Sequence, residues 1–136
     1  YVEDTFVLED WFELFVAQNM VLDALLYPLA YQHFDVALTQ QGGTAVSMLT
    51  QFMRDWKAES DKWLDATLKT AAAESPANAA QLHAWVSKWE ARALEALAPF
   101  AVLALGEASG AALNEVHSQW RGRLTKLGVA PQGAAA

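Results

Sequence analysis

The chain has 136 residues, a net charge of -7, no cysteine, and 54% hydrophobic against only 18% charged residues. A soluble domain of average composition carries about a quarter charged residues, so more than one face of this chain is expected to be covered, by itself or by partners. The missing cysteines exclude disulfides and thiol catalysis, and the nine scattered basic residues exclude the basic footprint that binds nucleic acids or anionic membranes.

We expect a cytoplasmic protein without a membrane span or a signal peptide. The longest charge-free stretch, residues 36–53, is interrupted by glutamines and glycines and is therefore not a continuous apolar run. With six Trp, six Phe and three Tyr, the chain is rich in the side chains that build thick cores and protein interfaces.

The first predicted helix covers about residues 4–38, where apolar side chains recur at helical spacing and also occupy most of the remaining circumference. A helix of this kind is buried on most sides. Pro28 is expected to kink or break it near Tyr27. Gln18, Asn19 and Asp23 interrupt the apolar pattern, and we interpret them as a polar seam that fixes helix register or meets a partner chain.

The second predicted helix covers about residues 45–73, after a stop at residues 41–44 that contains two glycines. Its core stripe is expected to comprise Leu49, Phe52, Trp56, Trp63 and either Ala66 or Thr67. If Trp56 is fully buried, its replacement by Ala would cost about 3–5 kcal/mol.

Glu59 interrupts this stripe between two tryptophans, where a carboxylate is costly to bury unless it is paired. The sequence favours a salt bridge with Lys62 or Arg54, or exposure at the edge of the stripe. The alternative is a remnant metal position, because Glu59 and Lys62 have the spacing of a Glu-x-x-His pair. A protonated Lys donates hydrogen bonds but cannot ligate a metal, so such a site would no longer bind one.

Two further helices follow. Ser75 and Pro76 form a helix start, and the third helix is expected to bend at Pro99 and to end before a turn at residues 106–110. The stripe predicted for it is Leu82, Trp85, Val86, Trp89, Ala93, Leu97 and Phe100. The fourth helix is expected to end at Gly128 and to bury Leu113, Val116, Trp120, Leu124 and Leu127.

These elements predict an all-α helical domain over residues 1–128 and a flexible tail over residues 129–136. Short connections favour antiparallel neighbours, and about 30 residues per helix corresponds to about 45 Å. Long antiparallel helices of this length are typical of ferritin-like bundles, so we expect part of such a bundle.

A helical bundle of this type can hold a di-iron centre, which needs Glu on two helices and Glu-x-x-His on two others. Here Ala30, Ala80 and Asn114 stand three positions before the three histidines, and none of them is a carboxylate. Motifs for nucleophilic catalysis and for phosphate binding are missing as well. The sequence therefore predicts no catalytic, cofactor-binding or metal-binding residue on this chain.

The remaining candidates have structural interpretations. His33 beside Asp35, and His117 near Glu115, are interpreted as polar groups at the surface or at helix ends. The tryptophan pair of the third helix is read as core or interface rather than as a ligand box.

Several stretches resemble the β subunit of bacterial phenol hydroxylases and the related toluene monooxygenases, most closely the phenol hydroxylases. The stretches are residues 1–7, 10–14, 17–23, 52–56, 59–63 and 89–97, which run in order over nearly the whole chain. Subunits of that family are more than twice this length, and this chain resembles their C-terminal part.

The resemblance implies a ferritin-like, non-catalytic β subunit that packs against an α subunit, which bears the di-iron centre. It also implies a γ subunit, the N-terminal part of β, a regulatory protein and an NADH-dependent reductase as partners in O2-dependent hydroxylation of aromatic rings. No cofactor is expected on this chain. The alternative is a free-standing helical module that binds a protein or a small ligand in a tryptophan-lined groove.

Overall fold

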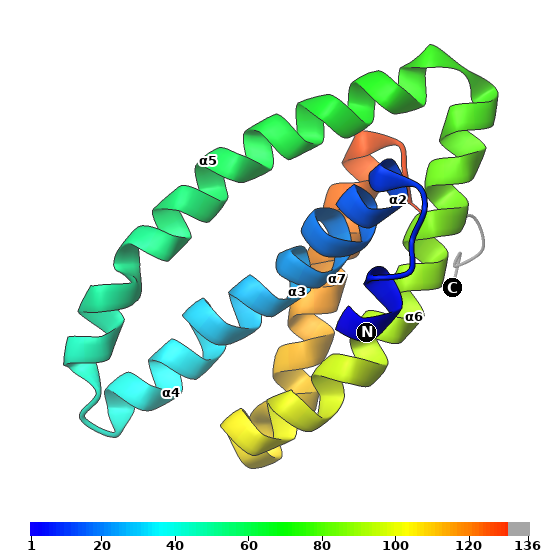
Figure 1. The fold of residues 1–136 in the computed structure, drawn as a ribbon. Coiled ribbons are helices and arrows are strands. Elements are labelled where there is room, and N and C mark those ends of the chain that lie inside the picture. The colour runs from blue at the N-terminus through cyan, green and yellow to red at the C-terminus, as the bar shows by residue number, and fades with distance from the viewer. Residues whose placement is uncertain (131–136) are drawn as a thin grey trace.

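The computed structural model describes residues 1–130, and no β-strand occurs in that range. The predicted all-α class is confirmed, and Figure 1 shows the long helices running antiparallel to their neighbours in the chain. The elements are α1 (Val2–Thr5), α2 (Trp11–Phe15), η1 (Val16–Leu22), α3 (Asp23–Pro28), η2 (Leu29–Phe34), α4 (Asp35–Gln40), α5 (Thr44–Glu74), α6 (Pro76–Leu105), η3 (Gly106–Ala108) and α7 (Ser109–Leu127).

The elements α2 to α4 follow one another without a break and form the first long helix, Trp11–Gln40. It begins later than expected, because the side chain of Asp10 caps it by accepting a hydrogen bond from the backbone N–H of Phe12 over 2.8 Å. The residues before the cap form the separate short helix α1. The predicted start near Asp4 was therefore wrong.

Pro28 does not break the first long helix, so of the two predicted outcomes, a kink or a break, the break was wrong. Two π-helical segments, η1 and η2, lie on either side of the α-helical turn that contains it. In η1 the backbone N–H of Asp23 bonds to the carbonyl of Gln18, five residues earlier. Such wider turns shift the backbone hydrogen bonds, and these local adjustments are how a helix continues past a proline.

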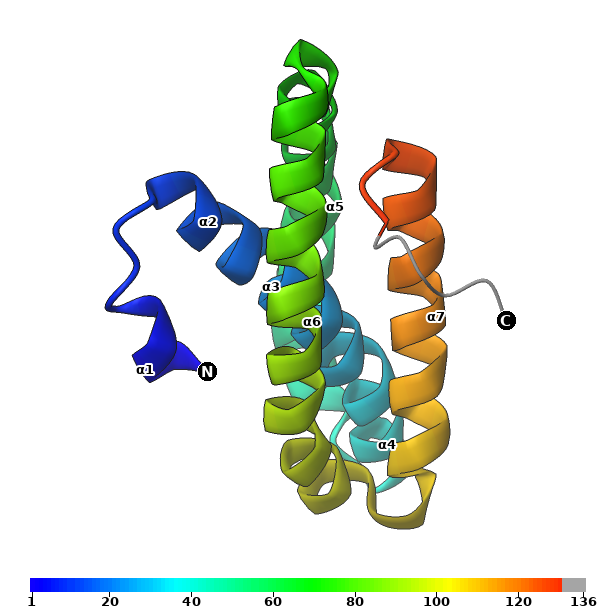
Figure 2. The same cartoon turned by 90° about the vertical axis from the view of Figure 1, so that its right-hand side faces the viewer.

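The core lies where the first long helix crosses α6 and α7, which lie side by side (Figure 2). Its largest fully buried side chains include Trp89 and Met20. The indole Nε1–H of Trp120 donates to the carbonyl of Met20 over 2.6 Å and links α7 to η1. The predicted burial is confirmed for Leu82, Val86, Trp89, Ala93, Leu97, Val116, Trp120 and Leu124. It was wrong for Phe100, which is exposed, and Trp85, Leu113 and Leu127 are only partly buried.

The stripe predicted for the second helix was wrong. The residues that α5 buries are Lys57, Leu64 and Leu68, whereas the predicted stripe is exposed. Helical spacing reveals that an apolar face exists, but it does not reveal which neighbour covers that face.

The end of α7 is as predicted, since Gly128 adopts a left-handed conformation with φ of 73°. The flexible tail does not begin at Val129. The side chain of Val129 is fully buried, and its backbone N–H donates a hydrogen bond to the carbonyl of Leu124. The rest of the predicted tail, residues 131–136, lies outside the described residues.

Two glycines near the end of the chain make a matched pair for a stability test. Gly128→Ala is expected to lower the free energy of unfolding by about 1 kcal/mol, because a Cβ is unfavourable at positive φ. Gly122→Ala, inside α7 with open space around the new Cβ, is expected to raise it by about 0.5–1 kcal/mol. Chemical denaturation of both variants checks the opposite signs, and equal signs would contradict this account of the helix end.

Two stretches, Trp11–Gln40 and Pro76–Leu127, are long and apolar enough to cross a membrane by length and composition alone. The first supplies much of the core, and a core helix meets the same criterion. The second contains two antiparallel helices, α6 and α7 (Figure 1). Their apolar character is therefore weak evidence for a span, and the expected absence of one stays a prediction.

Candidate functional site

The outward face of α5 is the most unusual surface of the chain. Leu49, Phe52, Trp56 and Trp63, which we call the α5 seam, are 74%, 65%, 54% and 63% exposed. Each of the two indoles has an aromatic neighbour within the chain, Phe15 for Trp63 and Tyr27 for Trp56, with ring centroids 5.7 and 6.2 Å apart. Large apolar side chains in a row on a surface are typical of protein interfaces.

Glu59 lies in the middle of the α5 seam, and its side chain is 73% exposed. It accepts a hydrogen bond from Lys62 Nζ over 2.6 Å. The predicted salt bridge with Lys62 is confirmed. The structure does not place Glu59 among inward-facing groups, as a remnant metal position would require.

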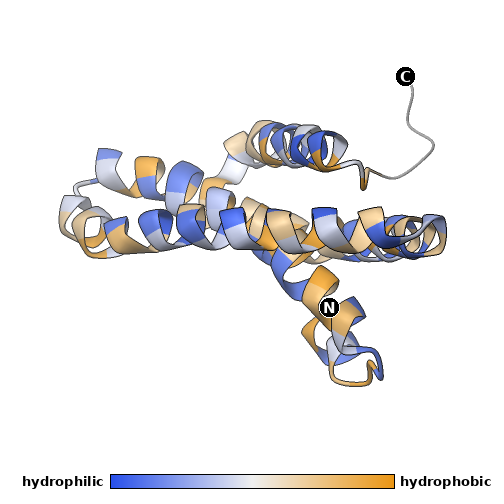
Figure 3. Ribbon diagram, turned by 90° about the horizontal axis from the view of Figure 1, so that it is seen from above, coloured by the Kyte–Doolittle hydropathy of each residue, from blue (hydrophilic) through white to orange (hydrophobic). Residues whose placement is uncertain are grey.

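An apolar groove continues from the α5 seam. Three tryptophans, Trp11, Trp63 and Trp85, line it from α2, α5 and α6, and its volume is about 670 Å³. The N-terminal segment adds more exposed apolar surface with Phe6 and Val7, and it projects to one side of the long helices (Figure 3).

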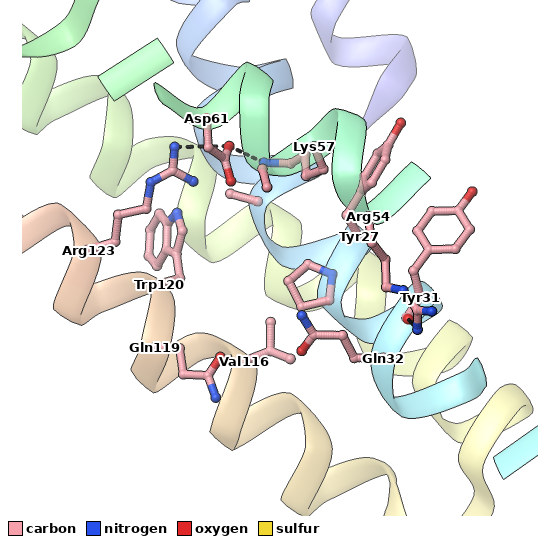
Figure 4. A pocket seen from close by; sticks show the side chains of 13 residues that line it. Tyr27, Tyr31, Gln32, Arg54, Lys57, Asp61, Val116, Gln119, Trp120 and Arg123 are labelled. Atoms are coloured by element: carbon pink, nitrogen blue, oxygen red, sulfur yellow. Dashed lines mark hydrogen bonds and ion pairs between the residues drawn. The ribbon is translucent and has the colours of Figure 1, made fainter. Parts of the chain in front are cut away.

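A second, more polar pocket lies on the inner side of α5, between that helix, the first long helix and α7 (Figure 4). Its volume is about 250 Å³. Two tyrosines, Tyr27 and Tyr31, and Trp120 supply its aromatic walls. Burial raises the pKa of the Tyr27 hydroxyl, and the charge of Asp23 adds to this shift.

Asp61 is the centre of the charge network in this pocket. It accepts a hydrogen bond from the largely buried ammonium group of Lys57 on its own helix. It also forms an ion pair with Arg123 of α7, whose Nη2 lies 3.0 Å from Asp61 Oδ1 (Figure 4). Arg123 also donates to Asp65, with its Nη2 and Nε lying 2.6 and 2.8 Å from Asp65 Oδ1. These pairs join α5 to α7, which contact each other little elsewhere.

The other end of α5 is held by a buried carboxylate. Asp35 of α4 accepts from Ser47 over 2.8 Å and from Arg54 over 3.3 Å. Arg54 also donates to the carbonyl of Tyr31 over 3.2 Å. Arg54 thus pairs with Asp35 rather than with Glu59.

The polar residues of the first long helix lie in and beside the π-helical segment η1. Gln18 Nε2 donates to Asp23 Oδ1 over 3.1 Å, and Asn19 donates to the carbonyl of Phe15 over 3.2 Å. Burial raises the pKa of the Asp23 carboxyl above its usual value, although the hydrogen bond from Gln18 and the charge of Lys57 counteract the shift. The charges of Asp23 and Lys57 thus interact, while the interpretation of these residues as a polar seam that fixes helix register or meets a partner chain stays a prediction.

The raised pKa of Asp23 predicts how stability depends on pH. An acid whose pKa is higher in the folded than in the unfolded state opposes folding when it is ionised. Asp23→Asn, which keeps an oxygen for Gln18, is therefore expected to raise the free energy of unfolding at neutral pH. The gain should shrink as the pH falls through the folded-state pKa of Asp23. Denaturant titrations at several pH values measure this, and a gain that grows toward acid would contradict it.

Sequence reasoning missed a second interhelical cluster. Glu90 of α6 is buried and accepts from His117 and Arg121 of α7, each over 2.6 Å. His117 was expected at the surface near Glu115, but it pairs with Glu90, while Glu115 lies 3.9 Å from His33 across the bundle. The spacing of His117 and Arg121, one helical turn apart, was the only signal in the sequence that both face one neighbour.

This donor set does not fit a metal centre. The interior carboxylates Asp35, Asp61 and Glu90 are each bound to a Lys, Arg or His, whose cationic groups compete for the oxygens that a metal would need. Across residues 1–130, no three His, Asp or Glu side chains come together in a group that could hold a metal ion.

The fold and these surfaces define a class: an all-α bundle that has an exposed aromatic seam and interior ion pairs. Comparison with known proteins places it. The model of the methane/phenol/alkene hydroxylase family matches residues 1–75, and the chain belongs to that family.

Two relatives are oxygenase components of phenol 2-monooxygenases. The chain is 57% identical over 129 residues to DmpL of Pseudomonas sp. (strain CF600) and 36% identical over 129 residues to MhpL of Acinetobacter pittii (strain PHEA-2). Each match covers 95% of this chain but only 38% of the relative's length.

A solved structure agrees in fold. The crystal structure of xenon-pressurized phenol hydroxylase from Pseudomonas sp. OX1 matches with a TM-score of 0.89 and 43% identity, over 98% of this chain and 40% of that one. The resemblance to phenol hydroxylases and the ferritin-like fold expected from it are thereby confirmed. The chain is similar to part of a hydroxylase subunit, and it spans about two fifths of the relatives' length.

Proposed function

We propose that this chain forms part of the non-catalytic β subunit of a di-iron hydroxylase that oxidises phenol or toluene. In this proposal it is the C-terminal part of β. It packs against the α subunit, which bears the iron, within a cytoplasmic assembly that also contains γ. A regulatory protein and an NADH-dependent reductase act on that assembly. The relatives support the oxygenase assignment, since each is named as an oxygenase component of a phenol 2-monooxygenase.

The observation that carries the structural role is the α5 seam. Four large apolar side chains in a row are more than half exposed, although the chain has ample apolar surface for a core. Leaving them in water costs about 25 cal/mol for each Å² of apolar surface, so covering them with a partner stabilises the assembly. The interior carboxylates hold the helices together through cations, which supports a scaffold rather than a redox centre.

The tryptophan-lined groove favours the second candidate, a free-standing helical module that binds a protein segment or a small apolar ligand. Its three indoles come from three separate helices and enclose a volume large enough for a small molecule. That module would act without iron and without the other subunits.

Mass and iron analysis of the protein from its native source separates the two candidates. We expect a large iron-containing complex in which this chain, or a longer polypeptide that contains it, is one component. His117→Gln should leave the iron content per complex unchanged, because Glu90 and His117 form the one buried carboxylate–imidazole pair among residues 1–130 and we assign it to helix packing. Loss of iron in this variant would contradict the non-catalytic role, and a lone metal-free particle would favour the module.

A further inference from the structure

The α5 seam has the spacing of a coiled-coil interface. Leu49, Trp56 and Trp63 follow one another at intervals of seven residues, and so do Phe52, Glu59 and Ala66. The two sets are offset by three residues, which is the a/d pattern of a heptad. All six positions are exposed, so no helix among residues 1–130 packs into this seam.

The α5 seam faces away from the core of the chain. The residues that α5 buries, Lys57, Leu64 and Leu68, fall roughly 130° around the helix from the centre of the a/d pattern, at 100° per residue. α5 therefore has two separate apolar faces. One packs on the first long helix, and the other is available over about 20 Å of helix length, at 1.5 Å per residue.

The charges on this face are mostly acidic. Glu59 occupies a core d position, and Asp55 occupies a flanking g position without an ion-pair partner in residues 1–130. Lys62, at the next g position, is already bound to Glu59. Seven of the nine Lys and Arg side chains are in ion pairs within the chain, so its outward charge is dominated by carboxylates.

We propose that the α5 seam is covered by a partner helix with its own apolar heptad pattern and with a Lys or Arg opposite Glu59. The apolar positions of that helix meet the indoles on either side of Glu59. Its cation and Glu59 set the register of the pair, because a shift by one turn would bury the carboxylate against apolar side chains.

A second copy of this chain fits the α5 seam less well. Two such seams would bring Glu59 and Asp55 of one copy close to the same carboxylates of the other. A separate helix with a basic residue has no such repulsion. The source of this helix, another part of the hydroxylase, rests on the proposed function. Its chemistry does not, because that follows from the residues of the α5 seam.

Photo-cross-linking in the assembled hydroxylase tests the proposal. The photoreactive p-benzoylphenylalanine is introduced in place of Trp56, and in a separate sample in place of Leu103, an exposed residue near the end of α6. Mass spectrometry then identifies the peptide joined to position 56. We expect one peptide with apolar heptad positions and a central Lys or Arg, which does not appear from position 103.

A charge exchange tests the central ion pair. Glu59→Lys is expected to weaken assembly by roughly 30-fold or more. Changing the Lys or Arg of the cross-linked peptide to Glu in the same sample should restore it. The control is Glu95→Lys, which makes the same charge change at an exposed position of α6 and should leave assembly intact.

Three cross-linking results overturn the proposal: no cross-link from position 56, a cross-link to α5 of a second copy, or a peptide without a basic residue at its centre. Failure of the charge exchange to restore assembly also overturns it. The proposed function is tested separately by the iron content of the complex. An iron-containing complex without a cross-link from position 56 would contradict only the proposal for the α5 seam. An iron-free complex whose cross-linked peptide has a central Lys or Arg would contradict only the hydroxylase role.

Discussion

Trp89→Ala is expected to lower the free energy of unfolding by about 3–5 kcal/mol. The side chain is fully buried, its ring packs edge-on against Tyr1 with centroids 5.0 Å apart, and its Nε1–H donates to Glu13 over 2.9 Å. Its removal leaves a cavity between α6 and the start of the first long helix. Circular dichroism during thermal unfolding should show a midpoint lowered by on the order of 10–15 °C.

The control is Trp56→Ala, which removes the same side chain from the α5 seam. Because Trp56 is half exposed and its aromatic neighbour Tyr27 lies 6.2 Å away between ring centroids, we expect a loss of about 1 kcal/mol within the chain. The loss of about 3–5 kcal/mol expected from the sequence for a fully buried Trp56 therefore does not apply. Equal losses in the two variants would show that the seam is packed within the chain and would contradict the structure.

Asp61→Ala is expected to lower the free energy of unfolding by about 2–3 kcal/mol. It leaves the largely buried ammonium group of Lys57 without its carboxylate, while Arg123 keeps Asp65. Breaking a fully buried pair costs about 3–5 kcal/mol, and partial solvent access to Asp61 reduces that figure. Denaturant titration of the single variant measures the loss.

The matched control removes both charges. Lys57→Met combined with Asp61→Leu is expected to recover most of the stability, because the unpaired buried ammonium group is then gone as well. If the double variant is as unstable as Asp61→Ala, the pair itself stabilises the fold, and the explanation by an unpaired ammonium group fails.

The sequence indicated the elements well where the signals are local. Helix ends at Gly42, Ser75 and Gly128 depend on backbone preferences and capping groups within a few residues, and all three were predicted. The cap at Asp10 is equally local, but the apolar residues on both sides of it concealed the break between α1 and α2.

The candidate site was predictable only in part. The sequence revealed the row of aromatic residues on α5 and the Glu59–Lys62 pair, since both depend on spacing within one helix. It could not show that Glu90, His117 and Arg121 meet, or that Asp61 joins α5 to α7, because such pairs depend on how two helices are placed side by side.

By itself the sequence determined that this chain is all-α, that it has long helices with short connections, and that residues 1–136 lack the paired Glu-x-x-His pattern of a di-iron centre. Each of these follows from the periodicity, the caps or the residue types within one segment. Only the tertiary structure decided which apolar face of each helix is covered. Two faces of α5 carry apolar residues at similar spacing. One face is buried and the other is exposed, because the neighbouring helices pack against only one of them.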